Sequence, residues 1–146
     1  MASLSIFRLM LIIMALKVFI WSAASFAAEQ ELTVSIEDID PCKGKLIVSL
    51  FKSQEGFLQS ALQNIVVSIN GKSVVVAQFK NVPYGSYAIS VIHDVNGNGQ
   101  LDTNFLGIPK EGYAFSSDAQ AIFGPPTFDE AKFYFDPENS IVKIHF

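Results

Sequence analysis

Residues 31–37 read Glu-Leu-Thr-Val-Ser-Ile-Glu, with apolar side chains at Leu32, Val34 and Ile36 and polar side chains between them. Successive side chains of a β-strand point to opposite faces of its sheet, so strict alternation is typical of a strand with one buried face. The pattern therefore favours a half-buried strand over a helix. How often it returns along the chain decides the fold class.

The same kind of run returns along the chain, and turn residues separate the runs. Asn70-Gly71 is the strongest turn signal, because both residues adopt positive φ readily, and it predicts a hairpin between the runs on either side. Asp136-Pro137-Glu138-Asn139 predicts a second hairpin, which closes the domain. Residues 53–61 fit a loop or a short helix. The further predicted strands are residues 45–52, 65–69, 73–79, 86–93, 112–116, 131–135 and 140–146.

No convincing amphipathic helix is found after residue 27. Short alternating runs separated by turn signals are the signature of an all-β domain. The sequence therefore predicts an antiparallel β-sandwich of seven to eight strands, with immunoglobulin-like or transthyretin-like topology.

The first 27 residues have the order of a secretory signal peptide. A short segment containing Arg8 comes first, residues 9–21 are apolar except for one lysine, and residues 22–27 are mostly small. Cleavage after Ala27 puts small side chains at both positions that a signal peptidase recognises. The mature protein is therefore predicted to begin at Ala28 and to be periplasmic or secreted.

An uncleaved membrane anchor is the alternative for this segment. Lys17 interrupts the apolar run, which leaves it shorter than the roughly 20 residues that span a bilayer. We therefore expect a single domain over residues 28–146, with no transmembrane segment after signal cleavage.

The composition restricts the class of partner. The chain has 146 residues, of which 50% are hydrophobic and 16% charged, enough for one modest globular domain and unlike a disordered protein. Residues 28–146 carry 8 basic and 14 acidic side chains and contain no arginine. Such an acidic domain binds nucleic acid poorly, so no nucleic-acid partner is expected.

The segment His93-Asp94-Val95-Asn96-Gly97-Asn98-Gly99-Gln100-Leu101-Asp102 resembles a calcium loop. Counted from Asp94, side-chain oxygens fall at positions one, three and five, glycine at six and a carboxylate at nine, as in the first nine positions of a twelve-residue calcium loop. The glutamine at position seven offers its backbone carbonyl. The candidate metal ligands are Asp94, Asn96, Asn98, Gln100 and Asp102.

The loop departs from this pattern at position twelve, where Phe105 replaces the bidentate glutamate. Glu111 or Asp118 would then have to close the site from farther along the chain. The alternative is a metal-free turn, because asparagine and aspartate side chains bond their own backbone well without an ion. Calcium is the only cofactor that the sequence suggests, in a structural rather than a signalling role.

Four segments together resemble a known family. They are residues 43–51 (KGKLIVSLF), the run from Phe79 through Val82-Pro83 to His93-Asp94, residues 96–104 (NGNGQLDTN) and residues 107–116 (GIPKEGYAFS). They are similar to the bacterial DUF2141 family over nearly all of residues 32–146. The resemblance implies a secreted or periplasmic β-sandwich of uncharacterised function, and it brings no catalytic residues. Residues 79–87 are also similar to carboxypeptidase-regulatory-like and transthyretin-like modules, which concerns the fold only.

The preferred functional hypothesis is a non-catalytic binding or scaffolding module of the cell envelope, with an envelope protein or a glycan as partner. The loop at residues 94–111 and an apolar segment at residues 119–128 would present the contact surface; the alternative for that segment is a lid over the open end of the sandwich. The second hypothesis is a small secreted hydrolase with a transthyretin-like fold that uses His93, Glu111 and Ser116. The single cysteine, Cys42, is assigned no role.

Overall fold

The computed structural model describes residues 30–122 and 124–146, so the predicted signal peptide and its cleavage site lie outside the described residues. Within them the chain forms eight strands, one 3-10 turn and one α-helical turn. The elements are β1 (Leu32–Glu37), β2 (Lys45–Phe51), β3 (Gln63–Ser68), β4 (Val75–Phe79), β5 (Gly85–Asp94), β6 (Tyr113–Phe115), η2 (Ser116–Asp118), α2 (Phe128–Ala131), β7 (Phe133–Phe135) and β8 (Ile141–His145).

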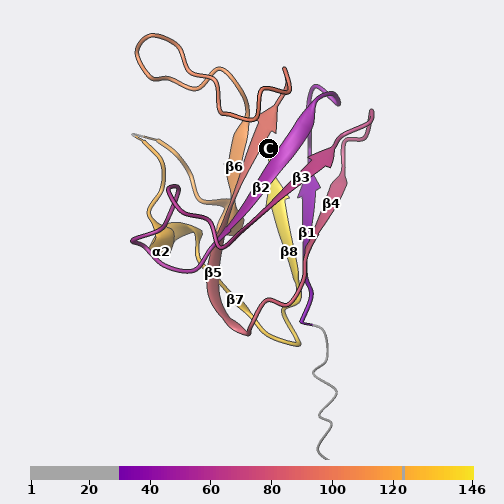
Figure 1. Cartoon of the computed structure of the whole chain (residues 1–146), viewed down its shortest axis with the longest axis vertical. Helices are drawn as coiled ribbons and strands as arrows, with labels where there is room; N and C mark the ends of the chain where they lie inside the picture. The colour runs from indigo at the N-terminus through magenta and orange to yellow at the C-terminus, as the bar shows by residue number, and fades with distance from the viewer. Residues whose placement is uncertain (1–29, 123) are drawn as a thin grey trace, which may run out of the picture.

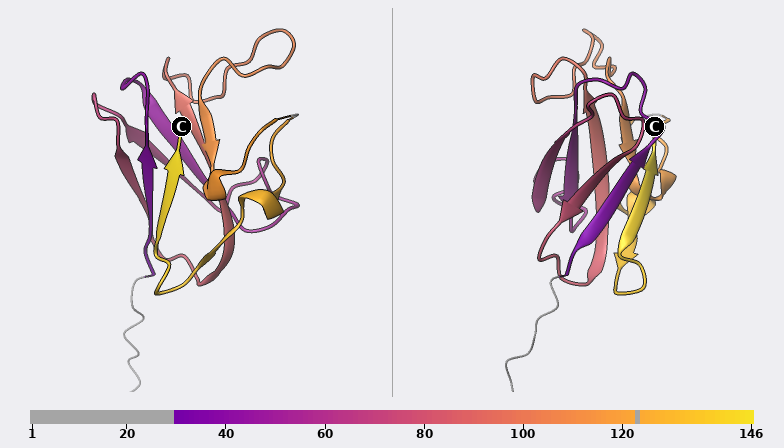
Figure 2. Two further views of the ribbon diagram at one scale, coloured as in Figure 1. Left: turned by 180° about the vertical axis from the view of Figure 1, so that it is seen from behind. Right: turned by 90° about the vertical axis from the view of Figure 1, so that its right-hand side faces the viewer.

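The strands form two sheets that pack face to face (Figures 1 and 2). The smaller sheet has the order β4-β1-β8, and the larger sheet has the order β3-β2-β5-β6, with β7 paired to the beginning of β5. The predicted all-β sandwich of seven to eight strands is therefore confirmed, but it is not wholly antiparallel, because β1 and β8 pair in parallel. The loop between β5 and β6 lies at the end of the sandwich opposite the beginning of β1 (Figure 1).

The two predicted hairpins are wrong. Asn70 and Gly71 do form the expected turn, with φ angles of 51° and 77°, but β3 pairs with β2 while β4 pairs with β1 in the other sheet. Likewise β7 pairs with β5, whereas β8 runs parallel to β1. In both cases the turn carries the chain from one sheet to the other, so the two strands that flank the turn form their hydrogen bonds in different sheets. A turn signal specifies that the chain reverses, and it does not specify the partner strand.

The main core fills the space between the sheets. Leu46, Val48 and Leu50 of β2 point inward at every second position, and Tyr87 and Ile89 of β5 do the same. Each such side chain contributes about 1.5–3 kcal/mol by leaving water. This packing makes the central strands β2 and β5 a rigid base for the side chains on their other face.

The outer face of the larger sheet carries a second, smaller core. Phe57 contacts Phe51 and Phe128 with ring centroids 5.3 and 5.9 Å apart, both edge to face. Two segments, α2 and the connection from β2 to β3, thus cover one half of this outer face. Residues 53–61 form turns here rather than a helix.

Helix α2 is a feature that the strand pattern did not predict. The predicted strand at residues 131–135 begins at Phe133, because residues 128–131 are helical. Thr127 and Glu130 form a capping box: the Thr127 side chain accepts from the Glu130 amide, and the Glu130 carboxylate accepts from the Thr127 amide. The Thr-x-x-Glu spacing is a known start signal for a helix.

Candidate binding cleft and the adjoining loop

The side chain of Asp94, the last residue of β5, organises the loop that follows. One carboxylate oxygen accepts from the amides of Gly97 (2.6 Å) and Asn98 (3.1 Å), and the other accepts from the amide of Gly99 (2.8 Å). Burial of the Asp94 carboxyl opposes its ionisation. The hydrogen bonds from the three amides outweigh that effect and hold its pKa below the ordinary value.

Three of the other predicted ligands contact one another in the same loop, whereas the contact of Gln100 is made by its backbone amide and not by its predicted carbonyl. The side-chain amide of Asn96 donates to Asp102 Oδ2 (2.6 Å), and that of Asn98 donates to Asp102 Oδ1 (2.9 Å). The Asn96 and Asn98 side-chain oxygens accept from the amides of Asn98 and Gln100. We call residues 94–102 the Asp94 loop. Its geometry is that of successive Asx turns.

Glu111 joins the two ends of the Asp94 loop. Its carboxylate oxygens accept from the amide of Val95 (2.9 Å) and from the amide of Asp102 (3.1 Å). Asp118, the other residue considered for closing the loop, instead lies 3.2 Å from Nδ1 of His145. Of the two, Glu111 is thus the one that the fold brings to the loop.

The side chains of the Asp94 loop can be compared with the ligands that calcium prefers. Asp94, Asp102, Asn96 and Asn98 are oxygen donors of the kind that calcium prefers. To present oxygen toward Asp102, the side-chain amides of Asn96 and Asn98 would have to rotate, because each now points its nitrogen there. Among the described residues no group of three or more His, Cys, Asp or Glu side chains has metal-site geometry. In the described structure these side chains bond one another and backbone amides, which is the arrangement of a metal-free turn.

Beyond the loop, residues 103–109 form a projecting tip. Thr103 and Pro109 form an isolated bridge, and the Asn104 side chain accepts from the amides of Leu106 and Ile108 (2.9 and 3.0 Å). Phe105, which stands at position twelve of the calcium pattern, is 94% exposed. The tip is ordered by its backbone hydrogen bonds and presents apolar side chains to solvent.

A cleft of about 720 Å³ occupies the uncovered half of the outer face of the larger sheet. We call it the outer cleft. Ser49 of β2 and Ser90 of β5, which are register partners, lie in its floor between larger apolar side chains. The other floor side chains are Phe51, Ile92, Tyr113 and Phe115.

Three segments distant in sequence form the walls of the outer cleft. Leu58 comes from the β2–β3 connection, Thr103 and Ile108 come from the β5–β6 loop, and Ile122 and Pro125 come from the segment before α2. All three segments project from the same side of the sandwich, on the left of Figure 1. Strands supply the floor and loops supply the walls, the usual arrangement of a binding site on a β-scaffold.

The second hypothesis required His93, Glu111 and Ser116 to converge, and the structure does not bring them together. Ser116 is fully buried, where its hydroxyl donates to the Ala131 carbonyl and accepts from the Ile89 amide (2.8 Å). Ser116 is thereby held next to Ile89. Ile89 lies four residues from His93 along β5, which is roughly 13 Å, so Ser116 and His93 are far apart. His93 is also buried.

His93 has a structural hydrogen bond of its own. Its Nε2 lies 2.8 Å from the carbonyl oxygen of Lys43, so this nitrogen carries a proton and donates it. The ring packs edge to face on Phe146, with centroids 5.8 Å apart. His93 therefore ties the end of β5 to the β1–β2 connection and to the end of the chain.

The predicted apolar surface at residues 119–128 needs a correction. Phe128 is only 8% exposed and belongs to the second core, so it is not a contact residue. Phe123 lies outside the described residues. The segment acts as a cover, as the alternative interpretation expected, but it covers the outer face of the larger sheet rather than an open end. Ile122, at 75% exposed, is the side chain it offers to solvent.

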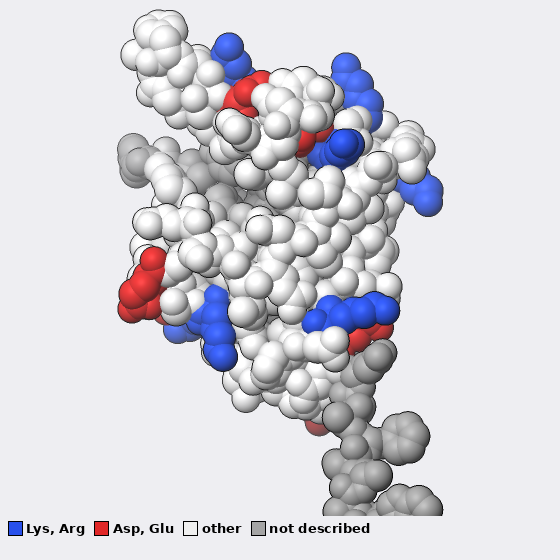
Figure 3. Space-filling model, viewed as in Figure 1, with Lys and Arg blue, Asp and Glu red and all other residues white. Residues whose placement is uncertain are grey.

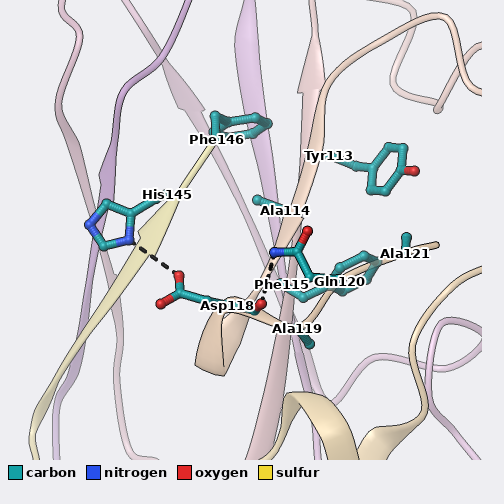
Figure 4. Close-up of a pocket in the computed structure, with 9 residues that line it drawn as sticks. All are labelled: Tyr113, Ala114, Phe115, Asp118, Ala119, Gln120, Ala121, His145 and Phe146. Carbon is teal, nitrogen blue, oxygen red and sulfur yellow. Dashed lines mark hydrogen bonds and ion pairs between the residues drawn. The ribbon is translucent and has the colours of Figure 1, made fainter.

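A second recess of about 590 Å³ lies where β6 and β8 approach each other (Figure 4). Figure 4 shows the Phe146 ring on the Tyr113 side of the last strand and His145 on the other side, with a dashed line from His145 to Asp118. His145 Nε2 also lies 3.8 Å from Glu37 Oε2. These exposed side-chain contacts link β8 to η2 and β1, and the sequence did not indicate them because the partners are remote in sequence.

Charge is unevenly distributed over the surface. In the view of Figure 3 the charged side chains gather near the two ends of the sandwich, and the face between them is uncharged. In the described part of the chain no helix is long and apolar enough to cross a membrane.

The fold and the cleft define a class: a small two-sheet β-sandwich with a loop-walled apolar cleft on one sheet. Residues 34–143 match the model of DUF2141, described as an uncharacterised protein conserved in bacteria, and the chain belongs to this family. No curated protein and no solved structure matches the chain.

Proposed function

We propose that this protein is a non-catalytic binding module of the bacterial cell envelope, and that its ligand site is the outer cleft. The cleft itself is the observation that carries the proposal. Ligand sites are concave, mostly apolar and some 300–1,000 Å³ in volume, with a few polar groups, and a cleft of about 720 Å³ with a serine pair in its floor fits that description.

The position of the cleft supports the same proposal. Its floor belongs to β2 and β5, the central strands of the larger sheet, whose opposite face is packed into the main core. Its walls belong to loops, which change between related proteins without cost to the core. An envelope protein or a glycan would present a side chain or a sugar ring to such a site.

Mapping of ligand contacts tests this proposal. ¹⁵N-labelled protein would be titrated with a mixed library of neutral and charged fragments, and backbone NMR shifts would be followed. Shifts that cluster on Ser90, Ile92, Thr103 and Ile122 are expected. Shifts scattered over the surface, or confined to the second recess, would contradict the outer cleft as the ligand site.

The envelope location is proposed from the signal-peptide pattern of residues 1–27. Expression in a bacterium and fractionation of its compartments test it. Protein recovered from the periplasm or medium should begin at Ala28 by mass spectrometry. Full-length protein in the cytoplasm would argue against export.

We also propose that calcium binds the Asp94 loop as a structural ion. The supporting observations are the oxygen spacing of the sequence and the convergence of Asn96, Asn98 and Asp102 in the fold. Because residues 101–109 wall the outer cleft, an ion in the loop would also steady that wall.

Thermal unfolding in chelator, calcium and magnesium tests the calcium proposal. For a dissociation constant of about 10⁻⁴ M, roughly 10 mM calcium stabilises the fold by about 2.7 kcal/mol, which is several degrees in Tm. Asp102→Asn should abolish a calcium-specific shift, and Asp129→Asn, at an exposed position of α2, should retain it. Equal thermal unfolding curves in chelator, calcium and magnesium would mean that the Asp94 loop is a metal-free turn.

A further inference from the structure

Among the described residues that line the outer cleft, none is charged. Its polar side chains are hydroxyls: Ser49, Ser90, Thr103 and Tyr113. A ligand that buried a carboxylate, phosphate or ammonium here would lose water without gaining a counter-charge, which is strongly unfavourable. The lining therefore selects against ionic ligands.

The serine pair limits the polar part of the ligand. Ser49 and Ser90 face each other across β2 and β5 and are 9% and 6% exposed. Each hydroxyl can donate one hydrogen bond and accept others. A ligand with a single hydroxyl or carbonyl group can meet this pair, while the rest of its surface contacts Phe51, Ile92 and Phe115.

The rim supplies apolar surface that the fold leaves in water. Leu58, Ile108 and Ile122, one from each wall, are 38%, 56% and 75% exposed. A molecule seated between them would remove these side chains from water on three sides, which favours an apolar body. The volume of the cleft fits one small molecule rather than a folded partner.

We propose that the outer cleft binds a free, uncharged small molecule with an apolar body and one hydrogen-bonding group that meets Ser49 and Ser90. This inference rests on the proposed function for the outer cleft as ligand site, and it replaces the envelope protein or glycan with a free small molecule as the occupant.

Two dyes of the same ring system test the class. N-phenyl-1-naphthylamine is uncharged, and 8-anilinonaphthalene-1-sulfonate is the same molecule with a sulfonate. Both fluoresce when they leave water. The neutral dye should bind saturably, and the sulfonate should bind about tenfold more weakly or worse. The site is tested with Ile108→Ser/Ile122→Ser, which should weaken the neutral dye by about tenfold.

A matched control keeps the test specific. Val76 and Ile141 are 53% and 65% exposed and lie on the smaller sheet, so Val76→Ser/Ile141→Ser removes comparable apolar surface elsewhere. Its affinity for the neutral dye should stay within about twofold of the parent protein. Both variants change exposed side chains, and equal Tm values would verify that both remain folded.

The outcomes separate the two proposals. If the sulfonate binds as tightly as the neutral dye and the rim variant weakens both, the cleft is a ligand site and the uncharged class is wrong. If neither dye binds, or if the control variant loses as much affinity as the rim variant, the cleft is not the ligand site and the proposed function fails. If the protein co-sediments with phosphatidylcholine vesicles and the rim variant does not, the cleft binds a lipid bilayer and the proposal of a free small molecule is wrong.

Discussion

The carboxylate of Glu111 accepts a hydrogen bond from the backbone amide of Val95, sixteen residues earlier, at 2.9 Å. Its second oxygen accepts from the amide of Asp102. One side chain thus fastens the beginning and the end of the Asp94 loop to the segment that leads into β6. The wall of the outer cleft depends on this connection, because residues 101–109 follow directly from it.

Glu111→Gln should loosen the Asp94 loop while leaving the sandwich intact. One of the two acceptor oxygens becomes an amide nitrogen that faces a backbone donor, and a hydrogen bond to a charged acceptor is lost, at a cost of about 1–3 kcal/mol. Hydrogen exchange should accelerate at the amides of Val95 and Asp102 and remain unchanged in β2. Glu138→Gln, at an exposed turn, is the control. Unchanged exchange at both amides would show that Glu111 does not hold the loop.

Asp94 should make the protein less stable in acid. Its pKa is held below the ordinary value of 3.8 by the amides of Gly99, Gly97 and Asn98, against the effect of burial. A carboxyl whose pKa falls on folding stabilises the fold above the unfolded pKa, and this stabilisation is lost as the pH falls through the folded pKa. Thermal unfolding from about pH 5 to pH 2 should therefore show the loss beginning near 3.8.

Asp94→Asn isolates this contribution from other carboxyls with lowered pKa values, such as Glu37 and Glu130. The Tm difference between the parent protein and the variant should be greatest near neutral pH and should shrink in acid. Parallel curves over the whole range would mean that the ionised carboxylate does not stabilise the loop.

Ser116→Ala should destabilise the domain without affecting binding in the outer cleft. The Ser116 hydroxyl joins β5 to the end of α2, and its loss leaves the buried Ile89 amide without that acceptor, at a cost of about 1–3 kcal/mol. Ser117→Ala removes an exposed hydrogen bond to the Lys132 carbonyl and should cost less than about 0.5 kcal/mol. Urea unfolding measures both. Equal costs would contradict the structural role of Ser116.

Phe128→Ala should cost about 3–5 kcal/mol, because it removes a buried ring from the second core. Phe105→Ala removes a ring that is 94% exposed and should leave the free energy of unfolding nearly unchanged. Denaturant titration of the two variants measures both free energies of unfolding for the same change, Phe to Ala. A similar small cost at both positions would show that the outer face of the larger sheet is not covered as described.

Deletion of residues 143–146 should abolish soluble protein. These residues include Ile144, which is fully buried and is paired with Ile36 of β1. Lys143→Ala, at an exposed position of the same strand, should express normally. A truncated protein with the parent Tm would show that β8 is dispensable to the smaller sheet.

Local signals predicted the strands, and non-local packing determined their partners. The alternation at Leu32, Val34 and Ile36 is complete within one segment, so β1 could be predicted from it. The turn at Asn70-Gly71 is equally local, and its positive φ angles are as expected. Which sheet each flanking strand enters depends on the whole inner surface, and the hairpin expectation failed there.

The candidate sites also divide into a part that local sequence signals predict and a part that depends on non-local packing. The contacts of Asn96 and Asn98 with Asp102 are local to one loop, whereas the Asp94 carboxylate turns to the backbone amides of residues 97–99 instead of joining them. The outer cleft was not predictable, because its walls come from three segments that meet only after the sheet has formed. The Thr127–Glu130 capping box was the one overlooked local signal; reading it would have placed α2.

The parallel pairing of β1 with β8 sets the order of events during synthesis. Residues 33–37 are among the first of the domain to be made, and their partners at 141–145 are among the last. Contacts so far apart in sequence form late, and they reduce the rate of folding. The smaller sheet therefore cannot be completed before residues 141–145 have been synthesised. Until then β1 has β4 as a partner but lacks its parallel neighbour, so one edge of β1 stays unpaired for most of the synthesis of this domain.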